Sequence, residues 1–200
     1  MTSKKILMEL HQRVLDMLRN NLPPELSYHN YEHTVDVLNA VERIAMAENT
    51  TDAELMLLKT AAVFHDTGYI YSRDNHEQRS CTIAREILRE IGADEESIEK
   101  VCEIILATRI PQEPKDKLSE IMCDADLDYL GRDDYFPISQ KVFSEFKTFG
   151  IIKDEIEWIP MQVKFLESHH YFTQTSINTR AGKKEENLIR IKENHKKNSI

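Results

Sequence analysis

The chain has 200 residues, an apolar content of 40% and a formal net charge of −9. The apolar content excludes a disordered chain, and the acidic balance excludes an extended nucleic acid as the main partner, because phosphate backbones are bound through basic surfaces. Five glycines and six prolines are too few for the many tight turns of an all-β fold, so the composition favours helices.

The first predicted element is a helix over residues 3–20. Its apolar residues recur at a spacing near 3.6, and the sequence LPPE at residues 22–25 stops it. Charged residues are scattered along this segment, which therefore has the pattern of neither a signal peptide nor a membrane anchor. We expect a cytoplasmic protein without a membrane partner.

Further helical signals follow one another to the end of the chain. A second helix is predicted from about Ser27–His29 to Ala47, and a capping box, TDAE at 51–54, begins a third that runs to about Asp66 and ends near Gly68. The remaining helices are predicted over residues 75–91, 94–108, 116–130, 138–149, 154–174 and 184–197, with Gly92, Gly131 and Gly150 as stops. No long alternating run predicts a strand, so we predict a single all-α domain over residues 1–200.

Two histidines stand four residues apart in the segment SYHNYEHT, residues 27–34. Because four residues make about one helical turn, we expect His29 and His33 on the same side of the second helix. His33 continues along that helix to Val37, Ala40 and Ile44, a line of apolar residues that indicates an inward face. Such a pair also occurs in helices that bind no metal, so these two histidines alone do not predict a metal site.

A second signal lies in KTAAVFHDTGYIY, residues 59–71, where a helix of small and apolar residues ends in the pair His65–Asp66. Helical spacing puts His65 on the same stripe as Leu58 and Ala62, so this histidine also faces inward. An ionisable group on an inward face needs a partner, because unpaired burial costs several kcal/mol.

The third signal is SEIMCDADLDYLG, residues 119–131. Asp126 adjoins the inward face set by Met122 and Ala125, whereas Asp124 and Asp128 are predicted to point away. Together, His33, His65, Asp66 and Asp126 form a mixed nitrogen and oxygen donor set. That set suits a divalent metal such as Mn, Fe, Zn, Mg or Ni, one ion or two. The alternative is that each group satisfies itself by hydrogen bonds in the core.

These residues resemble the H…HD…D signature of the HD-domain metal-dependent phosphohydrolases. YHNYEHT, FHDTGY and DADLDYLG are similar to the motifs of that superfamily, and HEQRS at 76–80 resembles the stretch that commonly follows the doublet. The resemblance covers about residues 28–131 and implies an HD-domain or phosphodiesterase-like helical bundle, which helices in residues 132–200 complete. HNYEH further resembles the HNxxH motif of cyclic-nucleotide phosphodiesterases, which implies that His33 is a metal ligand and His29 a proton donor.

The resemblance implies a hydrolase that cleaves a phosphomonoester or phosphodiester, of a nucleotide, by metal-activated water. Asp66 would then serve catalysis as a metal ligand, and His29 as general acid. His76 is the only histidine in the sequence between the pair His65–Asp66 and Asp126, which favours one metal ion over two. The alternative is a non-catalytic nucleotide-sensing module on the same scaffold. A homodimer is compatible with both the hydrolase and the nucleotide-sensing module.

The remaining ionisable residues are ranked by position alone. The expected substrate contacts are His76, Arg79, Arg180 and Lys184, and Arg73, Arg109 and Lys183 are further candidates for phosphate binding. The other histidines, His11, His169, His170 and His195, are expected to be structural or solvent-facing. Cys81, Cys102 and Cys123 lack any Cys-x-x-Cys spacing and are expected to be buried, reduced thiols.

Overall fold

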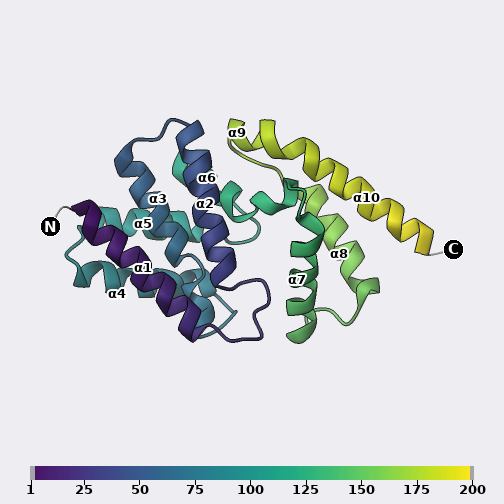
Figure 1. Cartoon of the computed structure of the whole chain (residues 1–200), viewed down its shortest axis with the longest axis horizontal. Coiled ribbons are helices and arrows are strands. Elements are labelled where there is room, and N and C mark those ends of the chain that lie inside the picture. Colours follow the sequence, from purple (N-terminus) through teal and green to yellow (C-terminus); the bar gives the residue numbers. More distant parts are fainter. Residues whose placement is uncertain (1–2, 199–200) are drawn as a thin grey trace.

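Two adjoining groups of helices make up the fold, with the chain termini at opposite ends of the molecule (Figure 1). The structure is a computed structural model that describes residues 3–198, and the side chains of residues 5–195. In chain order the elements are α1 (Ser3–Asn21), α2 (Tyr31–Ala47), α3 (Asp52–Phe64), η1 (Thr67–Ile70), α4 (His76–Glu90), α5 (Glu95–Leu106), α6 (Lys117–Asp126), η2 (Asp128–Gly131), α7 (Tyr135–Thr148), α8 (Glu155–Ser168), α9 (Gln174–Ser176), η3 (Ile177–Ala181) and α10 (Gly182–Asn198). No strand occurs in residues 3–198, which confirms the all-α prediction.

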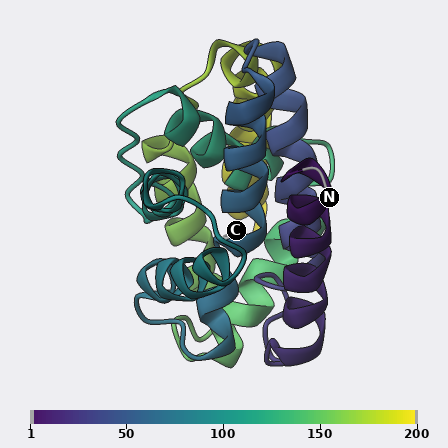
Figure 2. The same cartoon turned by 90° about the vertical axis from the view of Figure 1, so that its left-hand side faces the viewer.

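The first group, α1 to α6, surrounds an aliphatic core and faces the viewer in Figure 2. Fully buried members of this core include Leu18, Ile44 and Leu58. Helix α2 packs against α3, and α4 against α5. The predicted capping box starts α3: the Thr51 hydroxyl accepts a hydrogen bond from the Glu54 N–H, and the Glu54 carboxylate accepts one from the Thr51 N–H.

The second group, η2 with α7, α8 and α10, has a core that is rich in aromatic residues. Tyr129 and Tyr135 stack with ring centroids 6.1 Å apart, and Trp158 packs against the rings of Phe143 and Phe146. Tyr28, which precedes α2, also belongs to this core, so the loop before α2 joins the two groups. No helix within residues 3–198 has the length and apolar character needed to cross a bilayer.

The helix predicted over residues 154–174 is too long. Helix α8 ends at Ser168, and the chain is extended at His169 before Thr173 caps the short α9. The buried carboxylate of Asp124 holds this extended segment: it accepts hydrogen bonds from the backbone N–H groups of Phe172 and Thr173 and from the Thr173 hydroxyl. Because this partner lies about fifty residues away, no local pattern reveals the break.

The helix predicted over residues 116–130 also ends early, at Asp126, and the single turn η2 follows it. A Cβ atom at Gly131 would lie 2.3 Å from the carbonyl oxygen of Arg180, so the close approach of the C-terminal segment requires glycine there. Asp128 is buried beside this contact and pairs with Arg43 and Arg180. The prediction that Asp124 and Asp128 point away is wrong in one respect, because both are buried in contacts of their own.

Candidate active site

His33 lies in the first turn of α2, three residues after Asn30, the residue that caps the helix. The side-chain oxygen of Asn30 accepts a hydrogen bond from the His33 N–H at 3.1 Å and fixes the start of the helix. His29 therefore lies outside the helix, and the prediction that one helical face carries both imidazoles is wrong. Because Asn30 caps the N-terminus of the helix, the helix begins at Tyr31 and does not include His29.

The pair His65–Asp66 lies where α3 ends and η1 begins. Helix α4 holds this turn through Ser80, whose hydroxyl donates to the His65 carbonyl at 2.7 Å and accepts from the Gly68 N–H at 2.8 Å. The turn approaches α4 so closely that a Cβ atom at Gly68 would lie 2.0 Å from the carbonyl oxygen of His76. The doublet is thus fixed by backbone contacts on both sides.

The four predicted metal ligands lie together in a cluster in which His33, His65 and Asp66 are buried and Asp126 is partly exposed. The Nε2 atoms of His33 and His65 are 3.3 Å apart. One Asp66 oxygen, Oδ2, lies 3.5 Å from the first of these nitrogens and 3.2 Å from the second. Asp126 Oδ1 lies 3.2 Å and 3.5 Å from the same two atoms. His33, His65 and Asp66 place one ligand atom each within 4.8 Å of one another, and Asp126 contacts both imidazoles from outside that group of three.

These separations fit a bound metal ion. Ligand bonds of about 2.0–2.2 Å, at bond angles of about 90–110°, separate neighbouring ligand atoms by about 2.8–3.6 Å. The Nδ1–H of His65 donates to the carbonyl of Ala62 at 2.8 Å, which leaves the Nε2 lone pair directed at the cluster. Asp66 Oδ2 is buried without a hydrogen-bond partner among the described residues. A lone pair facing an unpartnered carboxylate oxygen calls for a cation between them.

The carboxylates of the cluster attract either a proton or a metal ion to the imidazoles. Burial disfavours charge on His65, but the adjacent carboxylates of Asp66 and Asp126 raise its pKa well above the ordinary value, so a bound metal ion would displace a proton from Nε2. Burial likewise disfavours negative charge on Asp66 and Asp126, yet the neighbouring histidines lower the pKa of each carboxyl group. Asp66 and Asp126 therefore remain negatively charged and attract a cation.

His29 reaches the site from the loop before α2, where Glu145 of α7 holds it. The Nδ1–H of His29 donates to Glu145 Oε1 at 2.5 Å, and Oε2 accepts from the backbone N–H groups of Tyr28 and His29. The imidazole stacks on the ring of Tyr69, with centroids 4.6 Å apart. Burial opposes protonation of His29, but the hydrogen bond to Glu145 and the charge of Asp66 raise its pKa above the ordinary value. His29 thus favours the protonated form.

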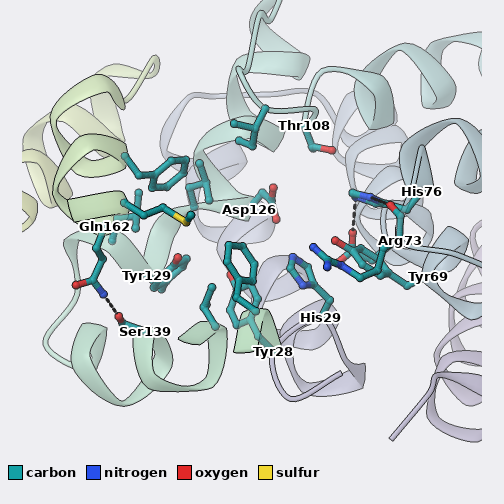
Figure 3. A pocket seen from close by; sticks show the side chains of 18 of the residues that line it. Tyr28, His29, Tyr69, Arg73, His76, Thr108, Asp126, Tyr129, Ser139 and Gln162 are labelled. Carbon is teal, nitrogen blue, oxygen red and sulfur yellow. Dashed lines mark hydrogen bonds and ion pairs between the residues drawn. The ribbon is translucent and has the colours of Figure 1, made fainter. Parts of the chain in front are cut away.

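A cavity of about 340 Å³ adjoins the cluster and is lined by Asp66 and Asp126. Figure 3 shows that its labelled side chains fall into two sets. His29, Tyr69, Arg73 and His76 lie on one side of Asp126 and Tyr28, and Tyr129, Ser139 and Gln162 lie on the other. The cavity therefore lies between the two groups of helices.

The predicted substrate contacts do not all reach this cavity. His76 lines it, with Nε2 3.6 Å from Asp66 Oδ1. Arg79 is exposed on the outer face of α4, Arg180 is paired with Asp128, and the buried Lys184 donates to the carbonyls of Leu166 and His169. These three residues do not line the cavity, because the contacts of Arg180 and Lys184 hold the C-terminal segment and Arg79 faces solvent.

Other residues of the site were not identified from the sequence. Glu145 holds His29 but does not line the cavity. It lies three residues after Val142 of the cavity wall, and this spacing on an otherwise apolar helix face was the available signal. Trp158 and Phe165 have the pattern of ordinary core residues, and nothing local distinguishes a cavity wall from a core. Arg73 was one of several unranked basic residues, and it does line the cavity.

Comparison with known proteins agrees with the geometry. The family model for the HD domain matches residues 30–128, a range that contains all four side chains of the cluster. This domain is typical of metal-dependent phosphohydrolases, and the chain belongs to the HD-domain superfamily. No curated protein and no solved structure matches the chain.

Proposed function

We propose that the protein is a metal-dependent phosphohydrolase that cleaves the phosphomonoester or phosphodiester bond of a nucleotide. One observation carries this proposal: the unpartnered Asp66 oxygen faces two imidazole nitrogens at the edge of a cavity that His29 also lines. A binding module without turnover needs no such open donor set beside a protonated imidazole.

His33, His65, Asp66 and Asp126 would hold the metal ion. When bound, a divalent ion supplies a Lewis acid that acidifies water and offsets negative charge on phosphoryl oxygens. The mixed nitrogen and oxygen donors are compatible with Mn²⁺, Fe²⁺, Zn²⁺, Mg²⁺ or Ni²⁺. One compact cluster supports a single ion, and His76, close to the second oxygen of Asp66, is the side chain that would contribute to another.

His29 acts as general acid in this proposal. Its Nδ1–H is committed to Glu145, so its Nε2–H is the proton that remains for the leaving oxygen of the substrate. The raised pKa of His29 keeps this proton available at neutral pH. Glu145 fixes the ring from behind and also holds the backbone that carries it, so the acid is positioned before substrate arrives.

Metal analysis of the purified protein, followed by phosphate release from a panel of nucleotides, tests this function. We expect about one equivalent of metal, and release of phosphate that stops on chelation and returns when Mn²⁺, Fe²⁺, Zn²⁺, Mg²⁺ or Ni²⁺ is added. For diesters, loss of the parent nucleotide is measured instead. A protein that binds nucleotides but hydrolyses none with any of these ions is a sensing module, and the proposal is then wrong.

A further inference from the structure

The two sides of the cavity differ in charge. Its charged and histidine side chains, among them His29, Arg73 and His76, come from the loop before α2, the region from α3 to α4, and the end of α6. The cavity residues that α7 and α8 contribute are all uncharged. The cavity therefore has an ionic end at the metal cluster and a neutral end formed by helices outside the matched domain.

Arg73 is the one arginine or lysine among the described residues that line the cavity. Among the described residues, its Nε is buried without a hydrogen-bond partner and no carboxylate lies within ion-pair distance of its guanidinium group. The lining carboxylates of Asp66 and Glu77 instead lie near His76 and Arg109. The guanidinium lies over the rings of Phe149 and Phe146, at 5.0 Å and 5.7 Å from their centroids. An arginine that is backed by aromatic rings and lacks a carboxylate partner is suited to an anion of the ligand.

The neutral end offers apolar surface together with a small polar group. Trp158, Met161 and Phe165 of α8 supply the apolar surface, and Phe146 adds to it from α7. The side-chain amide of Gln162 donates to the Ser139 hydroxyl within this wall. Aromatic surface with one amide is the usual environment for a flat, uncharged group that makes few hydrogen bonds.

The geometry points to a substrate that carries a single phosphate group on an uncharged aromatic or apolar group. Arg73 binds the phosphate beside the metal cluster, and the uncharged group packs against the wall formed by α7 and α8. This inference rests on the proposed function and names its substrate class. A phosphate monoester carries a charge of about −1.5 to −2, which one arginine and the metal site can match. A polyphosphate would bring further charge next to Asp66, Glu77 and Asp126 with no second arginine or lysine in the lining. The cavity volume is near the lower end of about 300–1,000 Å³ for small-molecule sites, and so fits one such molecule.

Calorimetric binding of two phosphonates, which cannot be hydrolysed, tests the two ends separately. With Mn²⁺ present, we expect phenylphosphonate to bind at least about tenfold more tightly than methylphosphonate. Arg73→Ala should weaken the binding of both by about tenfold to a hundredfold, because it removes a charged hydrogen-bond donor. Arg190→Ala is the matched control, since Arg190 also lies over a phenylalanine ring, that of Phe136, but does not line the cavity.

The neutral end is tested by Trp158→Ala, which should reduce the preference for phenylphosphonate and leave methylphosphonate binding unchanged. Met161→Ala, at a partly exposed position that the fold tolerates more easily, should reduce the same preference by a smaller factor. Phosphate release should also favour adenosine monophosphate over adenosine triphosphate in kcat/KM. Equal binding of the two phosphonates, unchanged binding in Arg73→Ala, or a tenfold preference for the triphosphate would overturn the inference.

The failure of this inference differs from failure of the proposed function. If phenylphosphonate binds with the expected dependence on Arg73 and Trp158 but no phosphate ester is hydrolysed, the ligand class stands and the hydrolase does not. If phosphate is released with no dependence on Arg73 or on an aromatic group, the hydrolase stands and the substrate class is wrong.

Discussion

The core formed by α1 to α6 is almost entirely aliphatic, whereas the core formed by η2, α7, α8 and α10 is rich in tyrosine, phenylalanine and tryptophan. Aliphatic side chains from closely packed helices interdigitate and leave little free space. The first group accordingly fixes the side chains of the proposed metal ligands at ends of helices that packing holds in place. The second group contributes large, rigid rings, and these rings line much of the cavity.

This difference indicates a division of labour. The proposed metal ligands all come from the first group, and the surface that would recognise the rest of the substrate comes largely from the second. Glu145 is the exception, because it lies on α7 and yet holds His29 of the first group. Substitutions in the two groups should therefore affect different kinetic parameters, with Glu145 linking them.

The largest effect should follow from Asp66→Ala. We expect loss of both bound metal and hydrolysis, with the helical content retained, because the substitution removes a donor that both imidazoles face. Metal content by mass spectrometry, turnover and circular dichroism measure these three properties. Asp16→Ala, at an exposed position of α1, is the control. Full metal content with wild-type turnover in Asp66→Ala would show that Asp66 is not a ligand.

His29→Ala should lower kcat by about 10²–10⁴-fold while the metal content stays unchanged, because it removes the proposed acid and no ligand. The defect should be much smaller for p-nitrophenyl phosphate, whose leaving group departs without protonation. Comparing kcat on this ester and on an alkyl phosphate separates an acid from a packing residue. Equal losses on both substrates would rule out the acid role.

Glu145→Gln tests the link between the two groups of helices. Glutamine can still accept the hydrogen bonds of the Tyr28 and His29 N–H groups, but it removes the charge that helps raise the pKa of His29. Since the acid must be protonated, activity is lost as pH rises through its pKa. The basic limb of the kcat profile should therefore move to lower pH, with a loss of up to about 10²-fold at neutral pH. A lower kcat with an unmoved limb would indicate a purely structural role.

The smallest effect concerns stability at acidic pH, to which each group contributes one buried neutral histidine. Burial, with the nearby charge of Lys59, lowers the pKa of His11 from 6.5 to about 4, and burial, with Lys184, lowers the pKa of His169 to about 3. Between these values and 6.5 the unfolded chain binds the proton and the folded chain does not. The contribution of these two histidines to the free energy of unfolding should therefore fall as pH drops below about 6.5, and no such loss should occur above it.

His11→Gln and His169→Gln should each flatten this dependence, because glutamine does not titrate. Urea unfolding at pH 7.5 and pH 5 measures the slopes. If one substitution flattens the slope and the other does not, only the first group of helices or only the second is sensitive to acid. Slopes equal to that of the wild type in both variants would contradict the linkage.

Local sequence determined the helices and the residues of the cluster. Thr51 and Glu54 form the predicted capping box, Asp94 caps α5, and Gly92 and Gly150 have the positive φ expected where helices stop. These features are predictable because they depend on interactions within a few residues. The inward placement of His33, His65 and Asp126 was likewise readable from helical periodicity.

Tertiary structure alone decided the position of His29, the end of α8 and the cavity. His29 is held by Glu145, which is 116 residues away, and the break after Ser168 depends on Asp124, 48 and 49 residues before its partners. In the sequence, Arg73 does not differ from several other basic residues, and only its contacts with the rings of Phe146 and Phe149 in the folded chain distinguish it. Such contacts join segments with no fixed spacing, so periodicity and capping rules, which act over a few residues, contain no information about them.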